Sequence, residues 1–160
     1  MNHAAAIERF SSAALAYCKW LEAYPGTAHE EHRTATYLVA ELYAAALALP
    51  DTEPNGIDPP VLGREQRAAL LTRLRSFPLQ YYWEIFHPLS DTPETAVCGD
   101  ITDDLGDIYI DVKEGLYAYA QSKQDAVWHW RTTFGLHWGA HATSALRALH
   151  AFDPASGNSR

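Results

Sequence analysis

The sequence predicts an all-α protein, a single-domain antiparallel bundle of about five helices. Apolar residues recur at the three- and four-residue spacing of helices, whereas alternating apolar and polar runs bounded by turn residues are missing. The chain of 160 residues is 48% hydrophobic and 20% charged, which is ordinary for one globular domain. We expect residues 1–153 to form the bundle and residues 154–160 to form a disordered tail.

Two long helices are predicted in the first third of the chain. The first covers about residues 4–23, carries an apolar stripe at helical spacing and ends before Pro25. The second begins at Thr27, whose side chain forms a capping-box pair with that of Glu30, and covers about residues 27–49.

Prolines and aromatic residues dominate the middle of the chain. The four prolines in residues 50–63 remove backbone donors and forbid a helix, so a loop is expected there. A third helix follows over about residues 64–76. The segment Tyr81–Leu89 is too short for a bundle helix and too aromatic for a surface loop. We therefore expect irregular turns at Tyr81–Leu89 that plug the bundle.

Two further helices complete the predicted bundle. Asp100 caps the fourth, which covers about residues 101–121. Ser122 and Asp125 resemble a capping box that opens the fifth helix, and this helix runs to about Phe152. Because their connection is short, we expect the two helices to pack as antiparallel neighbours.

Acidic residues cover one flank of the fourth predicted helix. Like charges at helical spacing repel one another, so something must offset the repulsion. Solvation and pairing with arginines is one explanation, and convergence on a divalent cation is the other. The acidic face comprises Asp100, Asp103, Asp104, Asp107, Asp111 and Glu114, of which Asp104, Asp107 and Asp111 are the candidate ligands.

The fifth predicted helix carries histidine and aromatic side chains where a simple bundle would have leucine. Arg131 and His141 fall within its apolar stripe, and His137 falls at the edge. Two histidines four residues apart can ligate one metal ion, although the zinc-protease motif has glutamate where this sequence has Trp138. A core histidine hydrogen-bonded to a carboxylate or carbonyl group is the alternative explanation for His141.

Antiparallel packing would bring the acidic and basic side chains of these two helices together. Residues equidistant from the connecting turn meet across such an interface, which puts Arg131 near Glu114 or Asp111. The same register puts the two histidines near Asp107 and Asp104. A structural salt-bridge network and a metal or acid–base site would both contain such a layer. The predicted polar cluster comprises Asp104, Asp107, Asp111, Arg131, His137 and His141, and all of these except Arg131 are candidate metal ligands.

Two glycines interrupt the fifth helix beside its histidines. Gly135 and Gly139 each cost a helix about 1 kcal/mol relative to alanine. We expect close backbone approach, or room for a bulky neighbour such as Trp83, to explain both.

Three motif-rich segments together resemble a bacterial family. They are Trp83, Phe86 and Pro88 in the aromatic segment, DDLxDIYxDxxxGL over residues 103–116 and WxxxFxxHWGxHAxxALxxLH over residues 130–150. The chain resembles the all-helical family catalogued as domain of unknown function 5063. The resemblance implies a short helical protein, and it transfers neither an activity nor a catalytic residue.

Charge, hydropathy and cysteine usage argue against several classes of function. A net charge of −8 repels phosphate backbones, so we expect no nucleic-acid partner. The longest apolar stretch, residues 36–50, is shorter than the roughly 20 residues of a bilayer span, so we expect no membrane insertion. Cys18 and Cys98 lack CxxC spacing and the N-terminus lacks a secretory signal pattern, which indicates a reducing, cytoplasmic location.

Two functional hypotheses follow from the sequence. The leading one is a non-enzymatic binding or regulatory module with an aromatic and acidic surface, whose partner is another protein or a second copy of the chain. The alternative is a divalent-metal-binding protein or metal-dependent hydrolase, in which carboxylates between the last two helices hold the ion and a histidine activates water.

Overall fold

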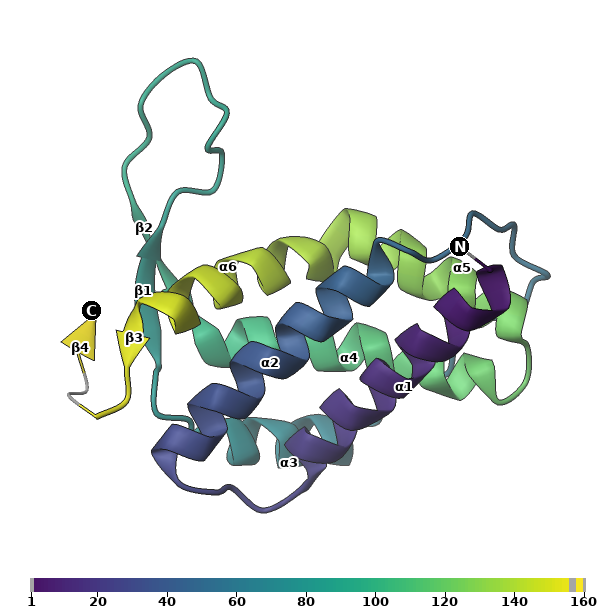
Figure 1. Cartoon of the computed structure of the whole chain (residues 1–160), viewed down its shortest axis with the longest axis horizontal. Coiled ribbons are helices and arrows are strands. Elements are labelled where there is room, and N and C mark those ends of the chain that lie inside the picture. The colour runs from purple at the N-terminus through teal and green to yellow at the C-terminus, as the bar shows by residue number, and fades with distance from the viewer. Residues whose placement is uncertain (1, 156–157, 160) are drawn as a thin grey trace.

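The structure is a bundle of helices with a two-stranded arm that projects from one end (Figure 1). It is a computed structural model that describes residues 2–155 and 158–159. The predicted all-α class is therefore confirmed, with the small hairpin as an addition. The helices are α1 (His3–Glu22), α2 (Ala28–Ala46), α3 (Arg64–Leu74), α4 (Ile101–Tyr119) and a continuous final stretch of α5 (Lys123–Thr133), the π-helix η1 (Phe134–Trp138) and α6 (Gly139–Ala151).

Side chains cap the helices at the positions that the sequence predicts. Thr27 and Glu30 form a complete capping box at the start of α2. The carboxylate of Asp100 accepts hydrogen bonds from the first N–H groups of α4, and the Ser122 hydroxyl accepts one from Asp125 at the start of α5. These caps fix where α4 and α5 begin and hence the short turn that joins them.

The helix α4 is central to the packing, in contact with α1, α3, α5, η1 and α6. From α1, the Tyr17 hydroxyl donates a buried hydrogen bond of 2.8 Å to the carbonyl oxygen of Leu105. The Phe10 ring lies 4.8 Å from the ring of Trp130 and 6.1 Å from that of Trp138, centre to centre. All four of these aromatic side chains are fully buried, so aromatic packing joins α1 to the final helical stretch.

A glycine lets α5 approach α4 closely. A β-carbon on Gly115 would lie only 2.0 Å from Nε1 of Trp130. The indole N–H donates to the carbonyl oxygen of Val112 at 3.0 Å, which satisfies the one polar atom of this buried ring. The glycine thus sets the spacing of the two helices that carry the candidate site.

We expect Gly115→Ala to lower the free energy of unfolding by about 2 kcal/mol, because the methyl group overlaps a buried ring that cannot move aside. Gly106→Ala is the matched control in the same helix, since its β-carbon would make an ordinary contact of 3.6 Å with Leu74. That control should be neutral or more stable by up to about 1 kcal/mol. Urea unfolding followed by circular dichroism measures both, and equal stabilities would contradict this account of the interface.

The predicted plug of irregular turns at Tyr81–Leu89 is wrong. Residues Tyr81–Glu84 form β1, which pairs antiparallel with β2 (Val97–Asp100), and the loop between them projects from the bundle (Figure 1). Gly99 makes this possible, because a β-carbon there would lie 2.5 Å from the Tyr82 ring that covers it. The Trp83 side chain is 71% exposed on the arm.

Two short strands after α6 lie beside the hairpin end of the bundle (Figure 1). Phe152–Asp153 forms β3 and pairs with β4 (Asn158–Ser159), with a turn at residues 154–155. The prediction of a disordered tail concerns residues 154–160, and three of these, residues 156, 157 and 160, lie outside the described residues. Within the described ranges, none of the helices is both long and apolar enough to span a lipid bilayer.

Candidate metal centre

The acidic face of α4 points at the final helical stretch. Asp104, Asp107 and Asp111 follow one another at spacings of three and four residues, so they share one side of the helix. Asp104 and Asp111 are 5% and 8% exposed, whereas Asp107 is half-buried. A buried carboxylate needs a hydrogen-bond donor or a positive charge beside it. The residues opposite these aspartates therefore decide what the site can bind.

The π-helix η1 brings the histidines opposite this acidic face. In a regular α-helix, two residues eight positions apart point in directions that differ by about 80° around the helix axis. The one extra residue in a π-helix reduces this difference to about 20°, so that the two residues lie on nearly the same face. Trp130 and Trp138, eight residues apart, are accordingly both fully buried on one face. In η1, the Gly139 N–H donates to the carbonyl oxygen of Phe134, five residues back. His129 and His137, which are also eight residues apart, lie on nearly the same face for the same reason.

Each imidazole of the pair is held by its own carboxylate. Nδ1 of His137 lies 2.7 Å from Oδ2 of Asp111, and Nδ1 of His141 lies 2.7 Å from Oδ1 of Asp104. Because a carboxylate only accepts, each Nδ1 carries the proton and donates it. In the neutral form of this tautomer, each ring presents the lone pair of Nε2.

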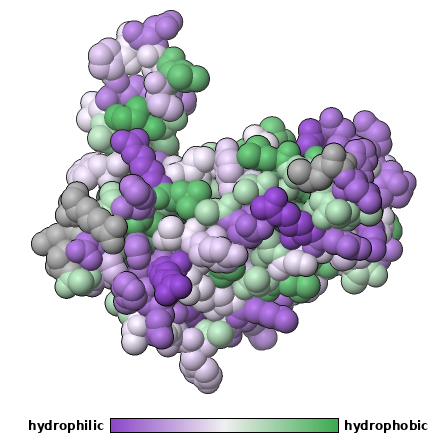
Figure 2. Space-filling model, in the orientation of Figure 1, coloured by the Kyte–Doolittle hydropathy of each residue, from purple (hydrophilic) through white to green (hydrophobic). Residues whose placement is uncertain are grey.

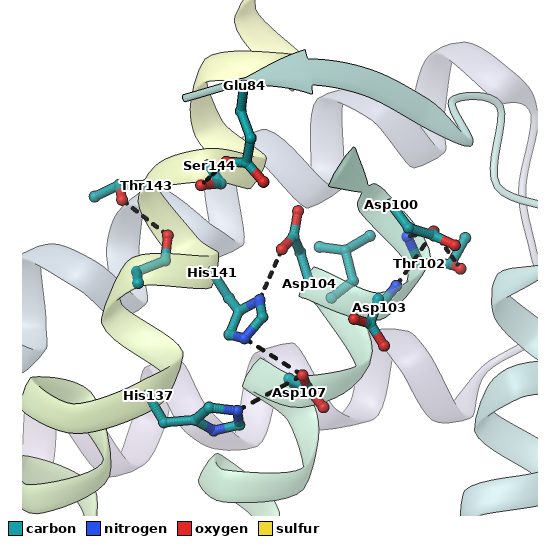
Figure 3. Close-up of polar contacts among 12 residues, drawn as sticks. Glu84, Asp100, Thr102, Asp103, Asp104, Asp107, His137, His141, Thr143 and Ser144 are labelled. Atoms are coloured by element: carbon teal, nitrogen blue, oxygen red, sulfur yellow. Dashed lines mark hydrogen bonds and ion pairs between the residues drawn. The ribbon is translucent and has the colours of Figure 1, made fainter. Parts of the chain in front are cut away.

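Both Nε2 atoms face one oxygen atom of Asp107. Oδ2 of Asp107 lies 3.6 Å from Nε2 of His137 and 3.4 Å from Nε2 of His141. Figure 3 shows the Asp107 carboxylate between the two imidazoles, with Asp104 on the far side of His141. The donor atoms of these three residues all lie within 4.8 Å of one another. The arrangement is a histidine pair and one carboxylate around a common point.

The two separations from the Asp107 oxygen fit the edges of a metal coordination shell. Ligand atoms at about 2.1 Å from an ion lie about 3.4 Å apart in a tetrahedral site and about 3.0 Å apart in an octahedral one. The observed 3.4 and 3.6 Å therefore suit tetrahedral Zn²⁺ better. Asp104 and Asp111 occupy the positions of the outer carboxylates that orient histidine ligands in zinc proteins.

A further residue from the hairpin, Tyr82, supports Asp104. The Tyr82 hydroxyl donates to Oδ2 of Asp104 at 2.6 Å, so both oxygens of this carboxylate are used. Glu84, also on β1, accepts a hydrogen bond of 2.6 Å from the Ser144 hydroxyl of α6. Sequence reasoning missed these residues, because the pairing of β1 with β2 that brings them to the site leaves no local signal.

Arg131 does not join the cluster, contrary to the expected contact with Glu114 or Asp111. Its guanidinium forms an ion pair of 2.6 Å with Asp51 and donates to the carbonyl oxygen of Leu49, in the segment that follows α2. The reason is the extra residue in η1. Arg131 lies seven residues before Trp138 and would share its face in an uninterrupted α-helix, but Trp130 takes that place instead.

A second group of potential ligands lies further along α4 and is already engaged. Oε1 of Glu114 accepts the backbone N–H of Leu62 at 2.8 Å and the Arg67 guanidinium. Nε2 of His129 lies 3.0 Å from the backbone carbonyl oxygen of Asp111. Although Asp111, Glu114 and His129 lie close enough to share an ion, these contacts give them a structural role.

Trp83 does not explain the two glycines, because it is exposed on the arm. A β-carbon on Gly139 would lie 2.4 Å from the carbonyl oxygen of Phe134, so this glycine permits the π-helix. A β-carbon on Gly135 would meet no atom within 4 Å, and nothing in the structure explains that glycine.

Comparison with known proteins now identifies the family. A family model described as Domain of unknown function (DUF5063) matches residues 2–153. The chain belongs to this family. Its structure is similar to the crystal structure of protein BF1032 from Bacteroides fragilis, with a TM-score of 0.77 and 25% sequence identity over 91% of this chain and 90% of that one. None of the curated proteins matches the chain.

The DUF5063 match confirms the family resemblance. The electrostatics of the site indicate which charge it favours. The hydrogen bond to Asp104 raises the pKa of His141, against the opposing effect of burial, and Asp107 acts in the same direction as Asp104. Burial raises the pKa of Asp104, while the bonds from His141 and Tyr82 oppose that rise. Positive charge is therefore favoured at this point, either as a proton or as a metal ion.

Proposed function

We propose that this protein binds one divalent transition metal ion, Zn²⁺ or an ion of similar coordination chemistry, at Asp107, His137 and His141. One observation carries the proposal: the two Nε2 atoms face the same Asp107 oxygen, while each Nδ1 is bound by a separate carboxylate. Imidazole nitrogen and carboxylate oxygen are the donor set that Zn²⁺ takes in proteins.

The distances favour this proposal over a plain salt-bridge network. A charge-assisted hydrogen bond between nitrogen and oxygen is about 2.7–2.9 Å long, as the two Nδ1 contacts are. The contacts of Asp107 at 3.4 and 3.6 Å are too long for such bonds. A carboxylate that served only as an ion-pair partner would close on one imidazole, whereas these positions leave space for an ion.

Three protein ligands would leave one tetrahedral position for water. The His137 side chain is 47% exposed, so solvent reaches the ligands directly. Closed structural zinc sites use four protein ligands, and open sites with three are typical of catalytic zinc, which lowers the pKa of its bound water to about 7. Hydrolysis by metal-activated water is the reaction that this open position favours.

The metal can be tested by elemental analysis joined to thermal unfolding. After removal of metal with EDTA and addition of Zn²⁺, the dialysed protein should retain one ion per chain. A ligand at 100 times its Kd stabilises the folded state by about 2.7 kcal/mol, which raises the Tm of a chain of this size by about 5–10 °C. Failure to retain zinc, with the Tm unchanged, would contradict the proposal.

The projecting arm favours a second candidate function, that of a module which binds another protein. On the arm, Trp83, Phe86 and Leu89 are 71%, 65% and 94% exposed, and hydrophobic side chains are visible on it in Figure 2. Exposed aromatic and aliphatic groups on a projecting loop are typical of protein-binding sites. A homodimer through the arm would give twice the chain mass in light scattering, and Phe86→Ser with Leu89→Ser should return it to a monomer.

A further inference from the structure

A cavity separate from the metal centre lies between the end of α1, the helix α3 and the middle of α4. Its volume is about 690 Å³, within the range of about 300–1,000 Å³ that is usual for small-molecule sites. Tyr109 borders it from α4. Because Tyr109 follows Asp107 by two residues, or about 200° of helical rotation, the cavity and the metal centre face opposite sides of α4.

The cavity exists because the side chains around it are short. Ala23, Ala69, Thr72 and Ser76 border it and are too small to fill the space where three helices meet. Apolar groups dominate the rest of the wall, including the otherwise buried Leu70. A ligand that enters this space would gain mainly from burial of its own apolar surface.

The charged groups in the wall are already paired. The Glu22 carboxylate accepts hydrogen bonds from Lys113 and the Tyr109 hydroxyl. The Arg73 guanidinium forms an ion pair with Glu31. A charged ligand would therefore lose its hydration without gaining a counter-ion, which favours an uncharged molecule.

The Arg73 guanidinium offers a ligand no free donor. The Arg73 side chain is 7% exposed, its Nε donates to the Ala23 carbonyl oxygen, and it stacks over the Trp20 ring. Nη1 of Arg73 has no hydrogen-bond partner within the part of the chain that is described, but it is buried and so does not face the open space of the cavity. The wall therefore favours apolar contacts over a specific hydrogen bond.

We propose that this cavity binds an uncharged, largely apolar small molecule. The site is independent of the metal centre, because no candidate ligand of the ion borders it. Binding would join α1, α3 and α4 and would stabilise the folded chain by mass action.

Nile red is a suitable probe, since it is uncharged and largely apolar. In a fluorescence titration of the full chain we expect saturable binding at one site. Ala69→Trp should weaken that binding at least about ten-fold, because the indole fills the cavity. Ala68→Trp is the matched control, since Ala68 is exposed on the same helix and does not border the cavity. No saturable binding, or an equal effect of both substitutions, would overturn the proposed site.

A second titration tests the chemical class. The anionic dye 1-anilinonaphthalene-8-sulfonate should bind the unmodified chain at least about ten-fold more weakly than Nile red. Equal binding of the two dyes would overturn the preference for an uncharged ligand.

Discussion

Replacement of His141 by alanine is expected to weaken Zn²⁺ binding by at least about 100-fold, because it removes one of three protein ligands. Loss of an outer carboxylate alone typically costs 10–100-fold in zinc proteins, and loss of a ligand costs more. Competition with a chromophoric chelator at neutral pH measures the change. Asp107→Asn should have a similar effect, and this residue makes no buried hydrogen bond whose loss would unfold the chain.

His150→Ala is the control for these two variants. His150 is exposed on the same helix, α6, and does not belong to either group of potential ligands. Its substitution removes an imidazole without changing the site, so the zinc affinity should be the same as in the unmodified chain. Equal affinities in His141→Ala and His150→Ala would mean that zinc, where it binds, binds elsewhere.

The second large effect is expected from Gly139→Ala, which acts on the site through the backbone. A methyl group would lie 2.4 Å from the Phe134 carbonyl oxygen, so η1 must distort or return to an α-helix. Either change rotates or shifts His137 relative to Asp107 and Asp111. We expect zinc affinity to fall about 10–100-fold, with a loss of about 2 kcal/mol in the free energy of unfolding.

Gly135→Ala provides the comparison within the same π-helix. Its β-carbon would point into open space, so the substitution should preserve the site and leave stability unchanged or raise it by up to about 1 kcal/mol. The same chelator competition and urea unfolding measure both variants. If Gly139→Ala bound zinc as tightly as Gly135→Ala, the π-helix would have no part in positioning the histidines.

The features that the sequence predicts well are local ones. Capping pairs such as Thr27 with Glu30 predict where helices start, because the side chain and the backbone group that it caps are within one turn. The spacing of Asp104, Asp107 and Asp111 similarly puts them on one helical face. The short turn at Ser122 then makes α4 and α5 neighbours, which accounts for the meeting of carboxylates and imidazoles.

The features that the sequence could not predict depend on long-range pairing or on a change of helical period. The pairing of β1 with β2 brings Tyr82 to Asp104. The two strands are separated by a loop, and the aromatic segment alone contains no pattern that predicts their pairing. The one extra residue in η1 rotates the face of α5 by about 100° relative to its position in an uninterrupted helix with α6. For that reason the sequence pattern groups Arg131 with the cluster and leaves out His129, whose Nε2 lies 3.0 Å from the carbonyl oxygen of Asp111.

Anomalous diffraction at the zinc absorption edge, from crystals of the zinc-loaded protein, tests the central claim most directly. We predict one strong peak between Asp107 and the imidazoles, at about 2.0–2.1 Å from Nε2 of His137 and of His141. A peak at Asp111, Glu114 and His129 instead, or no peak beside α4, would contradict the assignment of this cluster as a metal centre.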